Sequence, residues 1–188
     1  MAMLALMAAA VSFDGFGLGI ASRARGLRLG PAAAGLLSLA SILAASLGLA
    51  AGWGAREALP PGAVQSASAS LLLLLALWII AQSWLQFVDE RLAIVFGRPE
   101  GVDRNRSGVI EAREAFPLGL TLGIDAAILG LAAGLRGTSP VLALLVGLGK
   151  LFALCLGAWL GSRRRGSPWV EKMAVIPATV LIILAFWD

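Results

Sequence analysis

Long stretches without any charged side chain limit most strongly how this chain can fold. Residues 29–55 and 58–88 contain no Asp, Glu, Lys or Arg, and residues 115–135 contain only Asp125. Each stretch exceeds the ~20 apolar residues that a helix needs to cross a bilayer. With 59% hydrophobic and 14% charged residues, the chain is also far more apolar than a soluble domain. Three further apolar runs cover residues 2–22, 139–162 and 168–187.

These six runs predict an all-α polytopic membrane protein with six transmembrane helices. A membrane β-barrel would alternate polar and apolar residues, whereas "SLLLLLALWII", residues 70–80, is apolar on every face. The first run lacks a basic leader and contains Asp14, so we expect it to stay in the mature protein.

Basic residues are distributed unevenly among the connections. Twelve of the 15 Lys and Arg residues follow the first, third and fifth runs, whereas the other two connections contain only Arg56 and Arg136. Because basic loops remain in the cytoplasm, we expect both termini outside and the central loop inside. The basic balance is therefore a topology signal, and we expect no nucleic-acid partner.

The two halves of the chain resemble each other. A shift of 111 positions places Asp14 on Asp125 and Gly19 on Gly130, and a shift of 109 places Gly48 on Gly157. Three helices per half make the second half enter the membrane from the opposite side, which predicts two inverted three-helix repeats, as in many secondary transporters. The expected parts are residues 1–88, a cytoplasmic loop at 89–114, and residues 115–188.

The paired aspartates lie near the expected membrane midplane. Asp14 is about 18 Å along a helix that starts near residue 2, and Asp125 about 15 Å along one that starts near residue 115. An aspartate at this depth costs roughly 2.5 to 3.5 kcal/mol on insertion scales. A bound cation would offset that cost. The alternative is a protonated carboxyl, or one hydrogen-bonded to Ser12, Thr121 or backbone.

The available ligand types favour a hard ion. The chain contains no His, the commonest ligand for zinc, copper and nickel. Two carboxylates with nearby carbonyl and hydroxyl oxygens suit manganese, magnesium or calcium.

Lys150 is the third charge expected inside the membrane. It lies in the middle of the fifth run, and its repeat position, near Leu39 or Ser41, has no charge. We expect it to pair with Asp14 or Asp125 in the empty site, or to take the counter-transported proton. The alternative is a neutral lysine that only packs.

The central loop fits the twelve-position calcium loop. In "DRNRSGVIEARE", residues 103–114, Gly108 occupies the tight turn, three arginines offset the acids, and no second hand is available to pair with Ile110. We predict that this loop binds Ca²⁺ or Mn²⁺, with a solvated loop as the alternative. Its expected ligands are Asp103, Asn105, Ser107, the Val109 carbonyl, Glu111 and Glu114.

Several of these elements resemble a known family. "SFDGFGLGIASRARG", "GIDAAILGLAAGLRG", the loop between them and the ending "VIPATVLIILAFW" look like the small bacterial manganese efflux pumps, most of all their sporulation-associated branch. That family is similar to the lysine-exporter superfamily. The resemblance implies six helices in the bacterial inner membrane and metal export through Asp14 and Asp125. The pumps have further acids in and near helix two, where this chain has only serines.

The function predicted from the sequence is export of a divalent cation, manganese first, by alternating access in exchange for protons. One alternative is a non-transporting membrane protein of sporulation or assembly. Another is an ion-sensing regulator that uses residues 103–114. No motif for a nucleophile, base or cofactor appears, so we expect no enzyme activity.

Overall fold

The computed structural model describes residues 2–24, 26–88 and 107–163. Five of its helices are long and apolar enough to cross a membrane, as predicted. The sixth predicted span, residues 168–187, lies outside the described residues. The chain is a helical, multi-pass membrane protein. Its elements are α1 (Ala2–Ala24), β1 (Arg28–Leu29), α2 (Pro31–Ala58), α3 (Pro61–Val88), β2 (Val109–Ile110), α5 (Ala112–Leu135) and α6 (Val141–Arg163).

The helix ends lie within three residues of the predicted runs, and local chemistry explains them. α2 begins at Pro31, whose fixed φ suits the first helical position. α5 begins at Ala112, inside the segment 89–114 that the sequence predicted as the central loop. The reason is a capping box, in which the carboxylates of Glu111 and Glu114 accept from the free N–H groups of the first turn.

α1 and α5 end in the same way. Gly26 (φ 81°) and Gly137 (φ 70°) adopt the left-handed backbone conformation that commonly follows the last turn of a helix. Glycine adopts this conformation more easily than other residues because it has no Cβ. After α1, the N–H of Leu27 donates to the Ser22 carbonyl at 2.9 Å, and after α5 the N–H of Thr138 donates to the Ala133 carbonyl at 3.0 Å. These are Schellman turns at positions related by the 111-residue shift.

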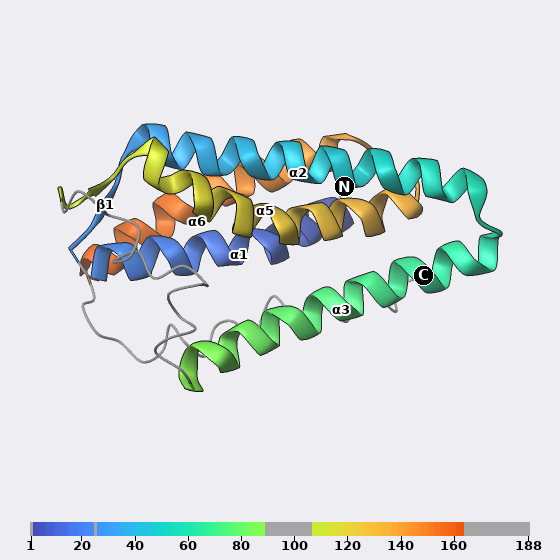
Figure 1. The fold of residues 1–188 in the computed structure, drawn as a ribbon, viewed down its shortest axis with the longest axis horizontal. Helices are drawn as coiled ribbons and strands as arrows, with labels where there is room; N and C mark the ends of the chain where they lie inside the picture. Colours follow the sequence, from blue (N-terminus) through green and yellow to red (C-terminus); the bar gives the residue numbers. More distant parts are fainter. Residues whose placement is uncertain (1, 25, 89–106, 164–188) are drawn as a thin grey trace.

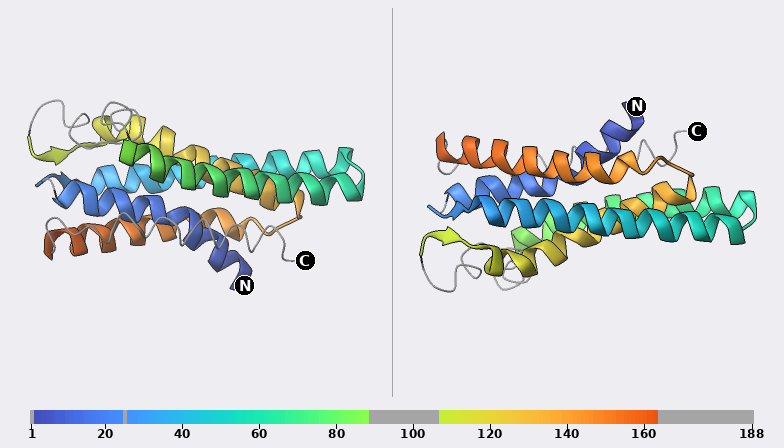
Figure 2. Two further views of the ribbon diagram at one scale, coloured as in Figure 1. Left: turned by 90° about the horizontal axis from the view of Figure 1, so that it is seen from below. Right: turned by 90° about the horizontal axis from the view of Figure 1, so that it is seen from above.

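The helices pair across the two halves of the sequence. α1 packs along α6 and α2 along α5, while α2 also contacts α6 and α3 packs on α5 (Figure 1). The α2–α3 and α5–α6 connections lie at one end of the bundle, and β1 lies at the opposite end (Figures 1 and 2). Helices far apart in sequence are therefore the closest neighbours.

Glycines let these paired helices approach until backbone meets backbone. A Cβ on Gly48 would overlap the Ala127 carbonyl of α5, and a Cβ on Gly157 would overlap the Phe16 carbonyl of α1. Such small residues commonly allow close helix packing in membranes. The contacts come in sets related by the two sequence shifts: Gly48–Ala127 with Gly157–Phe16, Gly130–Ala45 with Gly19–Leu154, and Gly52–Leu131 with Gly161–Ile20.

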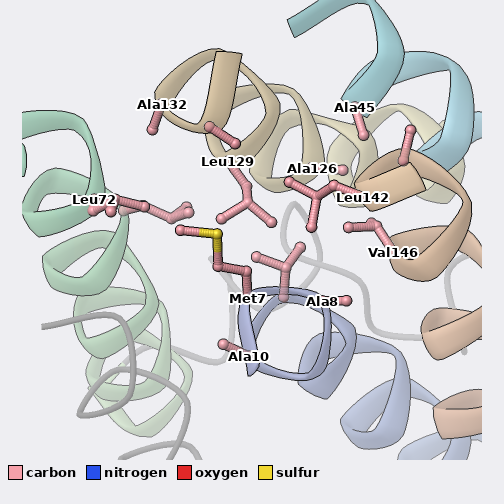
Figure 3. Close-up of a cluster of buried hydrophobic side chains, with 14 of the residues drawn as sticks. Met7, Ala8, Ala10, Ala45, Leu72, Ala126, Leu129, Ala132, Leu142 and Val146 are labelled. Carbon is pink, nitrogen blue, oxygen red and sulfur yellow. The ribbon is translucent and has the colours of Figure 1, made fainter. Parts of the chain in front are cut away.

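The bundle contains two apolar clusters. In Figure 3, Met7, Leu72, Leu129 and Leu142 point toward one another from α1, α3, α5 and α6. We call this group, together with Val146 and the small residues around it, the Met7 cluster. The second group, the Ile110 cluster, consists of Leu18, Ala33, Leu37, Ile110, Ala115, Leu118 and Leu154.

Candidate functional site

Three charged side chains lie in the middle of this apolar bundle. Asp14 lies halfway along α1, Asp125 halfway along α5, and Lys150 near the middle of α6. The Lys150 side chain is fully buried, Asp125 is 4% exposed, and Asp14 retains 19% side-chain exposure. The structure thus brings together the three intramembrane charges that the sequence singled out.

Lys150 forms an ion pair with Asp14. Its Nζ lies 2.9 Å from Asp14 Oδ2, and it also donates to the Leu122 carbonyl of α5 at 2.9 Å. Asp14 Oδ1 accepts from the Gly15 N–H at 2.6 Å. Gly15 leaves room for the lysine stem, since a Cβ there would lie 3.2 Å from Lys150 Cγ. The sequence allowed either aspartate as the partner of Lys150, and in the structure the partner is Asp14. A role of Lys150 in proton coupling remains a prediction.

Asp125 is left with an unused oxygen. Its Oδ1 is buried and has no hydrogen-bond partner within the described part of the chain. The indole N–H of Trp78, on α3, donates to the same carboxyl group, and both Asp14 and Lys150 lie close enough for their charges to act on it. Buried carboxylate oxygens normally have a partner, so Asp125 is the point in the site with capacity for a ligand.

Three buried serines of α1 and α2 donate hydrogen bonds to backbone carbonyl groups. Ser12 donates to the Ala8 carbonyl at 2.6 Å, Ser38 to the Gly147 carbonyl at 2.7 Å, and Ser41 to the Leu37 carbonyl at 3.0 Å. Each hydroxyl uses its proton on backbone, and its oxygen can still accept. The sequence left open a hydrogen bond between either carboxyl and Ser12 or Thr121. Within the described residues, both hydroxyls instead donate to backbone carbonyl groups.

The charges lie between the two apolar clusters. On α6, Val146 belongs to the Met7 cluster, Lys150 follows one turn later, and Leu154, another turn on, belongs to the Ile110 cluster. The same order holds on α1, where Asp14 separates Val11 from Leu18. An ion at this site would be separated from both ends of the bundle by closely packed apolar side chains.

The described part of the central loop is structured. Gly108 adopts φ 74°, as the tight turn of a calcium loop requires, and Ser107 Oγ lies 2.9 Å from the Val109 carbonyl oxygen. Glu111 and Glu114 form the capping box of α5, with Glu114 Oε2 accepting from the Glu111 N–H at 3.2 Å. Asp103 and Asn105 lie outside the described residues. Ion binding by this loop therefore stays a prediction.

Ile110 of this loop pairs with a segment outside it. The sequence contains no second calcium-binding hand, and Ile110 instead pairs in parallel with Leu29 through the short strands β1 and β2. The Gly30 N–H donates to the Ile110 carbonyl at 3.1 Å, and the Ile110 side chain is fully buried. A two-residue strand between two helices gives too little alternation to be recognised, so the sequence could not reveal it.

Trp78 and the Leu122 carbonyl are the site components that sequence reasoning missed. Leu122 lies three residues before Asp125, on the same side of α5, so helical spacing could have suggested it. Trp78 lies in a uniformly apolar run with nothing to set its orientation. Within the described residues, no group of three or more His, Cys, Asp or Glu side chains is placed to hold a metal. Any metal here would need hydroxyl, carbonyl or water oxygens beside the carboxylates.

Comparison with known proteins gives one informative similarity. The chain is similar to the probable sporulation protein YtaF of Bacillus subtilis (strain 168), with 24% identity over an alignment that covers 100% of this chain and 98% of that protein. No protein family model matches the chain. No solved structure matches it either.

Proposed function

We propose that this protein is a secondary transporter that exports a divalent metal cation, manganese first among the candidates, across the bacterial inner membrane by alternating access. Its ion site is built on Asp14 and Asp125. The observation that supports this most is the buried Asp125 carboxyl, whose Oδ1 has no partner within the described residues, beside the Asp14–Lys150 ion pair.

The charges around the site favour a cation as cargo. When Asp125 is ionised, two carboxylates and one ammonium leave a single net negative charge in the middle of an apolar bundle. Unpaired buried charge is strongly unfavourable, so a cation that binds at Asp125 gains the attraction of an uncompensated carboxylate. The serine and carbonyl oxygens nearby suit a hard ion.

The proposed architecture is a pair of inverted three-helix repeats, the second of which includes residues 168–187. The matched glycine contacts support this, because each contact of the first half with the second recurs with the roles exchanged. The matched Schellman turns at Gly26 and Gly137 point the same way.

The moving bodies we propose are not the sequence halves. The first helix of each half is held backbone to backbone by the second helix of the other half, so the halves cannot separate without breaking these contacts. Movement of α1 with α6 against α2 with α5 preserves both interfaces. The Met7 cluster and the Ile110 cluster would then open in turn, one toward each side of the membrane.

The orientation we propose follows from the basic connections, with the central loop cytoplasmic and both termini outside. The Met7 cluster then lies on the outer side of the ion site and the Ile110 cluster on the cytoplasmic side. We propose protons as the exchanged ion.

Flux through inside-out vesicles tests the proposal. Vesicles with wild-type protein should accumulate Mn²⁺ when their interior is acidified. Asp125→Asn and Asp14→Asn should reduce uptake to the level of protein-free vesicles. Glu57→Gln is the matched control, since it removes an exposed carboxylate at the end of α2 and should leave uptake unchanged. Undiminished uptake by Asp125→Asn would contradict the proposal.

A second candidate follows from the similarity to a probable sporulation protein. In this alternative the chain is a non-transporting membrane protein of sporulation or assembly, and the Asp14–Lys150 pair only fastens α1 to α6. It predicts no Mn²⁺ uptake by the wild type, together with a loss of thermal stability in Asp14→Asn.

A further inference from the structure

We infer that the two aspartates have different tasks: Asp125 is the ligand of the transported cation, whereas Asp14 is a positioning residue that holds Lys150, a cation built into the site. This inference rests on the proposed function. It adds which carboxylate touches the ion and which residue sets the charge of the site.

Lys150 already supplies Asp14 with a cation. The ammonium is held from two sides, by Asp14 Oδ2 and by the Leu122 carbonyl, at 2.9 Å each. The side chain is fully buried, and its stem lies against Gly15. An ammonium fixed in this way occupies the place that a cation bound to Asp14 would need.

Among the described residues, no ion pair supplies Asp125 with such a built-in cation. Its carboxyl is as buried as the surrounding apolar side chains, and Oδ1 has no partner in the described segments. Trp78 donates a hydrogen bond to the carboxyl group, but as a neutral donor it supplies no positive charge. The free coordination capacity of the site is therefore at Asp125.

The sequence repeat explains this inequality. The shift that places Asp14 on Asp125 is 111, and the 109-residue shift of the second helices places Ser41 on Lys150. Ser41 is fully buried on α2. One turn further along α2, the Ala44 Cβ lies 3.4 Å from a Cβ built on Gly123 of α5, which precedes Asp125 by two residues. The half of the site around Asp125 thus has a serine where the other half has an ammonium.

Each charge then has a predictable effect on ion binding. With Lys150 held by Asp14, the site has one net negative charge. Asp14→Asn releases the ammonium next to Asp125, which brings the net charge to zero and repels the cargo. Lys150→Ser makes the first half like the second and leaves two free carboxylates, which favours a divalent ion.

Mn²⁺ binding to the purified full-length protein, followed by the electron paramagnetic resonance signal of free Mn²⁺, tests the inference. Asp125→Asn and Asp14→Asn should each lose binding. The double variant Asp14→Asn/Lys150→Met removes both charges of the ion pair, and its affinity should return to within about threefold of wild type. Lys150→Ser should bind about tenfold more tightly or better. Glu57→Gln is the control with wild-type affinity.

The outcomes separate the inference from the proposed function. If the double variant binds as poorly as Asp14→Asn while Asp125→Asn also fails, Asp14 is itself a ligand; the inference is then wrong and the proposed function stands. Weaker binding by a folded Lys150→Ser would also overturn the inference. If Asp125→Asn binds like wild type, the proposed function itself is wrong. Should Lys150→Ser fail to fold, the double variant decides alone, because it buries no unpaired charge from the ion pair.

Discussion

Gly48 and Gly54 lie on the same helix and offer a direct test of the backbone contact between α2 and α5. A Cβ on Gly48 would lie 2.8 Å from the Leu131 nitrogen and closer still to the Ala127 carbonyl oxygen. Both are backbone atoms that cannot rotate away. To restore ordinary contact, the helices must separate by about 1 Å. A Cβ on Gly54 meets nothing within 4 Å.

The two alanine substitutions should therefore change the free energy of unfolding in opposite directions. Overpacking costs about 1 to 3 kcal/mol, and replacing a helical glycine by alanine returns roughly 0.5 to 1 kcal/mol. We expect Gly48→Ala to lower the free energy of unfolding by about 1 to 2 kcal/mol. Gly54→Ala should raise it by up to about 1 kcal/mol.

Unfolding in mixed micelles, followed by tryptophan fluorescence, measures both variants under the same conditions. Because both changes replace glycine by alanine in the same helix, the comparison cancels the change in helix propensity and in the entropy of the unfolded state. If Gly48→Ala is as stable as Gly54→Ala, α2 and α5 do not meet backbone to backbone. The repeat-related glycine contacts then no longer support the inverted repeat.

Two further predictions concern the strand pair and the moving bodies. Ile110→Ala should lower the free energy of unfolding by about 2 to 4 kcal/mol because Ile110 is fully buried, whereas its exposed neighbour Val109 should tolerate alanine within about 0.5 kcal/mol in the same unfolding assay. A Cβ on Gly149 would lie 3.5 Å from Ser12 Cβ, so Ser12→Cys/Gly149→Cys in a Cys155→Ala background should form a disulfide between α1 and α6. Mn²⁺ uptake by the oxidised protein should equal uptake by the reduced protein; a block that a reductant relieves would show that α1 and α6 move apart.

The positions of the helices could be predicted because the membrane imposes a simple rule. Charge-free stretches long enough to cross a bilayer are rare in other proteins, and α3 needed no other signal. The positions of Asp14 and Asp125 near the middle of their helices followed from counting along the predicted runs. The sequence shifts also predicted that the halves would be alike, since identical residues recur at fixed spacing.

The contacts of the site could not be predicted, because these helices are apolar on all sides. Without a polar face, hydrophobic periodicity does not show which way Lys150 points, and either aspartate was an acceptable partner. Trp78 was hidden for the same reason. The pairing of Leu29 with Ile110 depends on the distance between two connections, which becomes defined only when α1, α2 and α5 have packed.

The pairing of α1 with α6 also has a consequence for biosynthesis. Asp14 leaves the ribosome 136 residues before Lys150, which at about 5 to 20 residues per second corresponds to roughly 7 to 27 s. During that interval the nascent first helix contains a carboxylate whose ion-pair partner, Lys150, has yet to be translated. We expect this helix to dwell at the insertion machinery, or to enter the lipid as the neutral acid, until the fifth membrane segment emerges and locks it in place.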